Sequence, residues 1–191
     1  MKFYTLILLI FPMLLLGQNK FTKDLDGDAV LDSIYIDYKT SKIICKLSRD
    51  HFKKQESKAI EMLNESSYIK DAKKGFILSN NWMRAGYENQ FRYNEKIKKI
   101  RLIGMSRYEF GNAANDGSGT SSVNLLTGDY IGDWNYYDVT ENELIKIPTI
   151  KTKMYFPKIY LEDFNDEIYF NQYAEKCATL YHKYKKIKIN E

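Results

Sequence analysis

Alternating apolar and polar residues between positions 32 and 148 predict a β-rich body. The runs 34–38 and 43–47 alternate with a period of two, and the Thr-Ser pair between them predicts a hairpin. Regular spacing without intervening helices predicts antiparallel pairing. We therefore expect a mainly β fold, an antiparallel sheet, sandwich or meander of about 8 strands. Its further strands, rich in Tyr, Phe, Ile and Val, are expected at 59–63, 75–79, 87–94, 98–108, 121–126 and 130–137.

The pattern changes to a helical spacing after Leu161. Asn165 or Asp166 can cap the start of this helix, and lysines near its end suit the negative pole of the helix dipole. We expect one C-terminal amphipathic helix at about 165–185, packed on the sheet by a largely aromatic stripe. The stripe consists of Ile168, Phe170, Tyr173, Ala174, Cys177, Leu180, Tyr181 and Tyr184.

Residues 1–17 have the pattern of a cleaved signal peptide. Lys2 precedes an almost wholly apolar run, 3–16, which is shorter than the ~20 residues that span a bilayer and is broken by Pro12. Gly17 is small enough to precede a cleavage site, and an uncleaved anchor is the alternative. The sequence therefore predicts a periplasmic or secreted protein. Its single mature domain, 18–191, is expected to have no stable membrane span.

The charge changes this picture little. The formal net charge is +4 at pH 7, and loss of Lys2 with the signal peptide leaves about +3. This excess is too small to predict nucleic acid as a partner. The basic clusters at 96–101 and 183–188 are expected to be solvated surface.

The strongest local chemistry lies in the segment DLDGDAVLD at 24–32. Its aspartates occupy positions 1, 3, 5 and 9, with a glycine at position 4. Side chains at alternate positions of a tightly wound loop converge on one centre, and Ca²⁺ takes 6–8 oxygen ligands, one of them usually a backbone carbonyl from position 7. A polar surface turn without an ion is the alternative. The predicted calcium ligands are the carboxylates of Asp24, Asp26, Asp28 and Asp32 and the carbonyl of Val30.

This segment resembles the DxDGDxxxD calcium loop of FG-GAP/VCBS repeat proteins and the dockerin-type EF-hand loop. Two positions depart from the EF-hand pattern. Ala29 stands where EF-hand loops carry glycine, and Tyr35 stands where the bidentate glutamate belongs. Both departures favour a loop that runs into a strand over a helix–loop–helix unit.

A second resemblance, in pattern, covers more of the chain. The stretches DLDGD and LDSIYIDY, followed by NQFRYNEKIKKIRLIGMSRYEF and SSVNLLTGDY, are similar to small exported bacterial proteins with a calcium loop before a β-rich body. One group of these inhibits peptidoglycan-cleaving effectors in the periplasm. The resemblance implies an inhibitor or immunity protein against a peptidoglycan hydrolase as an alternative function.

Catalytic signals are weak. His51 and His182 have no carboxylate or cysteine neighbour at a spacing that sets up a dyad, and the GxSxG, HExxH, CxxC and phosphate-loop motifs do not occur. Cys45 and Cys177 either form one disulfide in an oxidising compartment or remain two buried thiols. We therefore expect a protein that acts by binding and not by catalysis.

Two stretches are candidates for binding. The small polar loop at 111–120 is longer than a hairpin needs, which favours a functional loop, with a mobile surface connection as the alternative. Its candidate contact residues are Asn115, Asp116, Ser118 and Thr120. The second stretch is more typical of core and cross-strand pairing and contains Trp82, Arg84, Tyr87, Phe91 and Tyr93. The expected function is an exported calcium-loop-containing binding module for a protein or a glycan.

Overall fold

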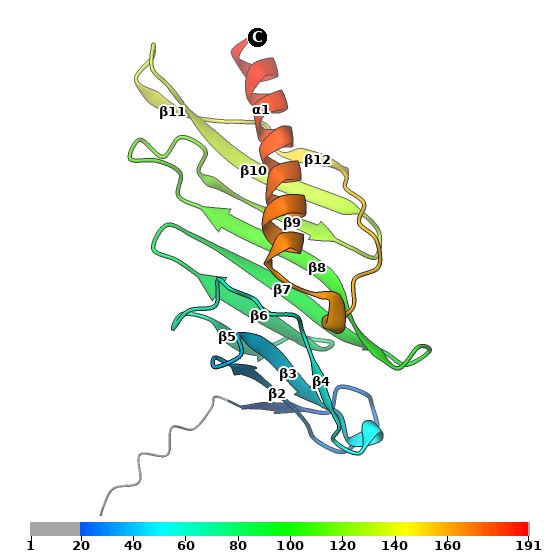
Figure 1. The fold of residues 1–191 in the computed structure, drawn as a ribbon. Coiled ribbons are helices and arrows are strands. Elements are labelled where there is room, and N and C mark those ends of the chain that lie inside the picture. Colours follow the sequence, from blue (N-terminus) through cyan, green and yellow to red (C-terminus); the bar gives the residue numbers. More distant parts are fainter. Residues whose placement is uncertain (1–19, 191) are drawn as a thin grey trace, which may run out of the picture.

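The computed structural model describes residues 20–190, and the expected signal peptide at 1–17 lies outside them. Within the described residues, two antiparallel sheets of four and eight strands are followed by one C-terminal helix. The prediction of a mainly β fold with a C-terminal helix is therefore confirmed. Figure 1 shows the helix lying across one face of the larger sheet. The smaller sheet lies beside the first strand of the larger sheet, away from the helix.

The smaller sheet follows chain order. The expected hairpin at 34–47 forms its two central strands, with Ile34 opposite Cys45 and Ile36 opposite Ile43. These four side chains are buried because they occupy alternate positions on the face that points to the core. The strands are β1 (Phe21–Lys23), β2 (Asp32–Asp37), β3 (Lys42–Lys46) and β4 (Lys54–Glu56).

The larger sheet is a meander whose last strand folds back on an earlier one. Its final two strands share one edge of β10, one pairing with each half of that strand. Between Gln90 and Phe91 the register with β8 shifts by one residue, so Ile103 is the extra residue of a bulge. The buried positions of β8 therefore change from Ile100 and Leu102 to Met105. The strands are β5 (Tyr68–Asp71), β6 (Phe76–Asn81), β7 (Ala85–Asn94), β8 (Lys99–Glu109), β9 (Gly119–Asn124), β10 (Asp129–Asp138), β11 (Glu143–Lys146) and β12 (Ile150–Lys153).

The prediction of a strand at 59–63 is wrong. Ile60 is fully buried, but its backbone N–H donates to the carbonyl of Ser41 and its carbonyl accepts from Leu63, so the segment turns. An isolated apolar side chain in a buried turn produces a short run like that of a strand. The strands that pattern analysis missed, β1, β4, β5, β11 and β12, have three or four residues each and too little alternation to be recognised.

The helix is longer than expected at its C-terminal end. A π-helical segment, Ile168–Ala174, leads into the α-helix α1, Glu175–Ile189, after a 3-10 turn at Leu161–Asp163. Asp166 does not cap the helix. Its carboxylate accepts hydrogen bonds from the N–H of Met62 (3.0 Å) and the hydroxyl of Tyr87 (3.3 Å), which ties the helix start to the sheet.

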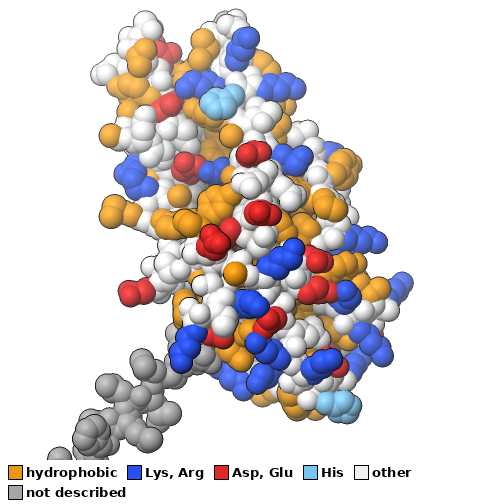
Figure 2. Space-filling model, in the orientation of Figure 1, with side chains coloured by type: hydrophobic (Ala, Val, Ile, Leu, Met, Phe, Trp, Pro, Cys, Tyr) orange, Lys and Arg blue, Asp and Glu red, His pale blue; other side chains and the backbone are white. Residues whose placement is uncertain are grey.

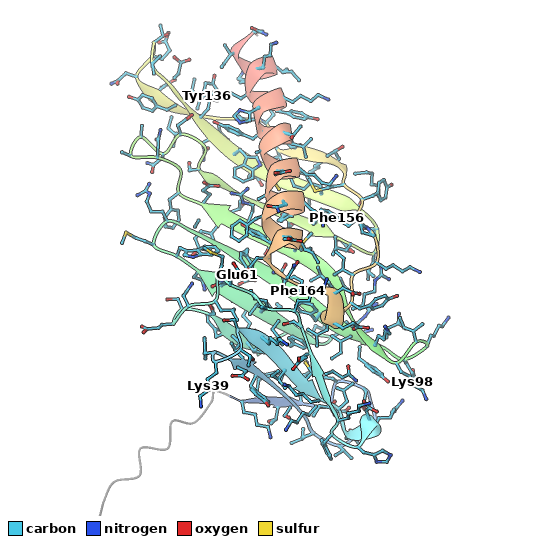
Figure 3. All side chains as sticks on the ribbon, viewed as in Figure 1. Lys39, Glu61, Lys98, Tyr136, Phe156 and Phe164 are labelled. Carbon is cyan, nitrogen blue, oxygen red and sulfur yellow. The ribbon has the colours of Figure 1, made fainter. Side chains whose placement is uncertain are left out.

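One cluster of buried apolar side chains spans both sheets and the helix. Phe91 stacks on Phe76 (ring centroids 5.2 Å apart) and meets the edge of Phe164 (5.1 Å), where the chain turns into the helix. Figure 3 labels Phe164 between the helix and the strands. Tyr173, on the helix, is also fully buried, and its hydroxyl lies 2.9 Å from that of Ser121 on β9. The expected aromatic stripe therefore packs against the sheet.

Polar contacts also join the two sheets. Lys23 on β1 forms an ion pair with Asp71 at the end of β5 (2.7 Å), and the hydroxyl of Tyr38 donates to the carbonyl of Ser67 (2.6 Å). Across residues 20–190, no helix has the length and apolar character to cross a membrane.

Candidate calcium site in the N-terminal loop

The aspartate-rich segment forms a tight loop between β1 and β2. The Asp24 carboxylate accepts three backbone hydrogen bonds, from Gly27 (2.7 Å), Asp28 (3.3 Å) and Ala29 (3.0 Å), and so winds the loop around itself. Gly27 and Ala29 both have positive φ angles, +79° and +68°. In Figure 1 the loop lies at the lower right, beside the short turn η1 (Ser48–Asp50).

Three of the predicted ligands converge. One carboxylate oxygen from each of Asp24, Asp26 and Asp28 lies within 4.8 Å of the other two. Three negative charges at this separation repel one another unless a cation lies between them. Hard oxygen ligands of this kind suit Ca²⁺, whose bonds to oxygen measure about 2.3–2.6 Å. The arrangement therefore fits the predicted ion at these three positions.

Asp26 carries the clearest sign of an unfilled ligand position. Its side chain is fully buried, and its Oδ1 atom has no hydrogen-bond partner within residues 20–190. Its Oδ2 atom accepts only a long bond, 3.4 Å, from the backbone N–H of Arg49. Burial, followed by the charges of Asp32 and Asp28, raises the pKa of Asp26 above its ordinary value. A buried carboxylate oxygen without a donor is costly, and a bound cation would satisfy it.

Asp32 is held by backbone and hydroxyl donors, and its role as a calcium ligand stays a prediction. It is fully buried and lies outside the converging group. Its Oδ2 accepts from the N–H of Leu25 (2.7 Å), and its Oδ1 accepts from the N–H (2.7 Å) and hydroxyl (3.0 Å) of Ser48. Asp32 therefore closes the loop and fastens it to η1.

Val30 contributes its N–H to the loop, donating to Asp28 Oδ1 (2.9 Å). That bond, together with the hydroxyl of Ser48, holds the pKa of Asp28 below its ordinary value. Asp28 thus stays ionised and available to a cation. The role of the Val30 carbonyl as a ligand stays a prediction.

Pattern analysis missed two residues of this site, Ser48 and Arg49. The Ser48 hydroxyl donates to Asp28 Oδ2 (2.8 Å), and the Nε atom of Arg49 lies 3.9 Å from Asp26 Oδ1. They come from the 3-10 turn after β3, well beyond the loop in sequence. No local motif signals their presence, because only the pairing of β2 with β3 brings that turn beside the loop.

Ala29→Gly is expected to stabilise the protein by about 0.5–1 kcal/mol. Alanine at a left-handed φ costs about 1–2 kcal/mol, of which glycine's larger unfolded-state entropy cancels about half. Urea unfolding with and without calcium measures the gain. Ala178→Gly on the exposed face of α1 is the control and should destabilise by about 1 kcal/mol. A loss of stability in Ala29→Gly would contradict the inference that the left-handed φ of Ala29 is strained.

The predicted binding loop at 111–120 is held to the rest of the fold by hydrogen bonds to Asp116. The Oδ1 atom of Asp116 accepts from the N–H of Tyr137 (2.8 Å), the hydroxyl of Tyr181 (3.2 Å) and the ammonium of Lys185 (3.1 Å). Although burial opposes it, bonds from Tyr137 and Lys185 hold the pKa of Asp116 below its ordinary value. Asp116 therefore anchors the loop to β10 and α1.

The other candidates in this loop divide between structural and exposed positions. Asn115 has a φ of +58° and donates its N–H to the carbonyl of Asn112 (2.9 Å). The hydroxyl of Ser118 accepts from the amide of Asn135 (3.1 Å). Thr120 is exposed on β9. Ligand binding by this loop stays a prediction, and Thr120 is the candidate best placed for it.

The aromatic and arginine stretch at 82–93 is structural. Tyr87 and Phe91 are fully buried, and Trp82 packs on Tyr87 with ring centroids 5.5 Å apart. The guanidinium of Arg84 donates to the carbonyls of Phe110, Gly111 and Asn112 at 2.9–3.2 Å. Arg84 thereby supports the base of the neighbouring loop. Tyr93 is partly buried against the core.

Both cysteines are free and buried. Cys45 lies on β3, and Cys177 lies on α1 with its sulfur 3.5 Å from the hydroxyl of Ser121. Of the two alternatives that the sequence leaves open, the structure has the buried thiols. Burial raises the pKa of each thiol, so neither is an accessible nucleophile.

The described residues thus contain an acidic loop whose chemistry suits calcium, fastened to a β-rich body by Asp32 and Ser48. No known protein family, curated protein or solved structure matches this chain. The function proposed below therefore rests on the residues and geometry of the chain itself.

Proposed function

We propose that this chain is an exported, non-enzymatic binding protein whose N-terminal loop holds one Ca²⁺. The observation that carries the calcium proposal is the buried Oδ1 atom of Asp26. It lacks a hydrogen-bond partner, and Asp24 and Asp28 each place a carboxylate oxygen close to a carboxylate oxygen of Asp26. Export is inferred from the pattern at 1–17, and extracellular calcium modules work at a Kd of about 10⁻⁴–10⁻³ M.

The ion would have a structural role at the edge of the smaller sheet. The loop joins β1 to β2, and Asp32, the first residue of β2, accepts hydrogen bonds from Leu25 at the start of the loop and from Ser48 in η1. An ion that binds the folded loop better than the unfolded chain shifts the folding equilibrium towards the native state. Calcium would therefore hold the N-terminal strand in the sheet.

We place ligand binding on the face of the larger sheet opposite the helix. On β9, Thr120, Ser122 and Asn124 are exposed and alternate with the buried Ser121 and Val123. The strand register places Ser122 opposite Ser106, and Ser106 opposite Glu88, so these groups form a row across three strands. Two shallow depressions, of about 280 and 380 Å³, both include this row.

The chemistry of this row favours a glycan as the ligand. The hydroxyls of Ser106 and Ser122 can exchange hydrogen bonds with sugar hydroxyls, and Glu88, which pairs with Lys70, keeps a second carboxylate oxygen that can accept one. Tyr108, in the second depression, offers a ring on which the apolar face of a sugar can pack. A protein partner would more often select a surface richer in aromatic side chains and arginine.

A co-sedimentation assay tests the proposed glycan binding. We expect the mature protein to sediment with at least one insoluble polysaccharide, among cellulose, chitin and peptidoglycan sacculi, and Ser122→Arg to abolish this by filling the row. Lys176→Ala, an exposed change on the helix side, is the control and should bind like wild type. Absence of wild-type binding to all three would reject the glycan. Capture of a peptidoglycan hydrolase instead would identify the inhibitor function.

Isothermal titration with CaCl₂ tests the ion directly. Wild type should show a saturable heat with one ion per chain, and Asp26→Ala should show none. Absence of heat from wild type, together with equal melting temperatures in calcium and in chelator, would mean that the aspartates form only a polar turn.

A further inference from the structure

The guanidinium of Arg49 lies between two carboxylates from different parts of the chain. Its Nε atom is 3.9 Å from Asp26 Oδ1 in the calcium loop, and its Nη1 atom is 3.6 Å from Glu95 Oε1. Glu95 belongs to the turn between β7 and β8, and Figure 3 labels its neighbour Lys98 at the tip of that hairpin. Neither contact of Arg49 is short enough to be a hydrogen bond. The guanidinium is therefore shared between the two carboxylates.

The base of Arg49 is fixed although its end is free to move. The preceding residue, Ser48, is bonded to Asp28 and Asp32, and the N–H of Arg49 itself points to Asp26. The side chain of Arg49 is 37 % exposed, and that of Glu95 is 80 % exposed. The guanidinium can thus rotate towards either carboxylate while the backbone of η1 stays in place.

We propose that Arg49 sets the calcium affinity of the loop by acting as the counter-charge of Asp26 when no ion is bound. This inference rests on the proposed calcium site. An arriving Ca²⁺ takes Asp26 Oδ1 as a ligand and repels the guanidinium, which moves to Glu95. Arg49 therefore weakens calcium binding, and Glu95 offsets part of that weakening by accepting the displaced charge.

The size of the effect follows from the geometry. A unit charge about 5 Å from a divalent ion changes the affinity about 16-fold in water without salt, and salt at about 0.15 M lowers this to about fivefold. Glu95 is more exposed, so its contribution is screened more strongly and should be about twofold. The site would then release calcium more readily than its three carboxylates alone would allow.

Calcium titration calorimetry on wild type, Arg49→Gln, Arg49→Lys, Glu95→Gln and the double variant Arg49→Gln/Glu95→Gln tests the proposal. We expect Arg49→Gln to bind about fivefold more tightly, Arg49→Lys to stay within about twofold of wild type, and Glu95→Gln to bind about twofold more weakly. The decisive result is the double variant, which should match Arg49→Gln, because Glu95 acts only through Arg49.

Two further readouts separate this role from a structural one. In chelator, Arg49→Gln should melt below wild type because Asp26 has lost its counter-charge, while its rise in melting temperature on adding calcium should be larger. Lys153→Gln, which removes a lysine paired with Asp129 on the larger sheet, should leave calcium affinity unchanged.

Different failures have different meanings. If wild type binds calcium but Arg49→Gln has the same Kd within twofold, the role of Arg49 is overturned and the site stands. An effect of Glu95→Gln that persists in the absence of Arg49 would also overturn it. If wild type binds no calcium, the proposed site and this inference both fall.

Discussion

Phe91→Ala is expected to lower the free energy of unfolding by about 3–5 kcal/mol. Phe91 is fully buried at the point where β6, β7 and the start of the helix meet. Its ring contacts Phe76 and Phe164, which also contribute fully buried rings. Because the surrounding strands and helix cannot all collapse into the space, alanine leaves a cavity as well as less buried apolar surface.

Chemical denaturation of wild type and Phe91→Ala, each in calcium, measures this loss. Phe110→Ala is the matched control, since Phe110 is 51 % exposed and should contribute less than about 1 kcal/mol. Phe91→Leu should fall between them because it leaves a smaller cavity. An effect of Phe91→Ala no larger than that of Phe110→Ala would mean that the aromatic cluster does not connect the helix to the sheet.

Asp26→Asn is expected to change stability in opposite directions with and without calcium. In calcium at a hundredfold excess over Kd, wild type should gain about 2.7 kcal/mol from the ion, a gain the variant should largely lose because a neutral amide is a weaker ligand. In chelator, the variant should be more stable than wild type by about 1 kcal/mol. It removes a buried charge that Asp28 and Asp32 repel and places an N–H donor beside the neighbouring carboxylates.

Thermal melts of both proteins in millimolar calcium and in chelator test whether the order of stability of wild type and Asp26→Asn reverses between the two buffers. A gain of 2.7 kcal/mol corresponds to a rise of about 5–10 °C for a domain of this size. Asp129→Asn is the control, because that carboxylate pairs with Lys153 on the exposed edge of the larger sheet. It should leave the response to calcium unchanged. Lower stability of Asp26→Asn in both buffers would show that, without calcium, the attraction between Asp26 and Arg49 outweighs the burial of Asp26 and its repulsion by Asp32 and Asp28.

The longer strands were predictable because their side chains alternate over enough residues to specify one buried face. The expected runs at 87–94, 98–108 and 130–137 correspond to β7, β8 and β10, displaced by at most two residues at each end. The short edge strands carry no such pattern, since three or four residues offer one or two alternations. β12 forms only because β10 leaves half of its edge free beyond β11.

For the aspartate-rich loop at 24–32, the residue pattern alone specifies the local chemistry. Aspartates at alternate positions, with a glycine between them, bring three carboxylates together by local winding alone. The departure at Ala29 was also visible, and the structure keeps the left-handed backbone there despite the side chain. Local features of this kind depend only on residues within one turn of the chain, so spacing is sufficient to predict them.

Which hydrogen bonds each carboxylate makes depends on contacts between distant parts of the chain. Asp32 lies at a ligand position by spacing, and the turn after β3 supplies Ser48 as a hydrogen-bond donor to it, whereas the other three aspartates converge without such a donor set in common. Arg49 reaches Asp26 for the same reason. Strand pairing joins residues far apart in the sequence, so their hydrogen bonds and charges reach the site only once the sheet has formed. The sequence therefore predicts which groups can bind calcium, and the fold determines which of them remain free to do so.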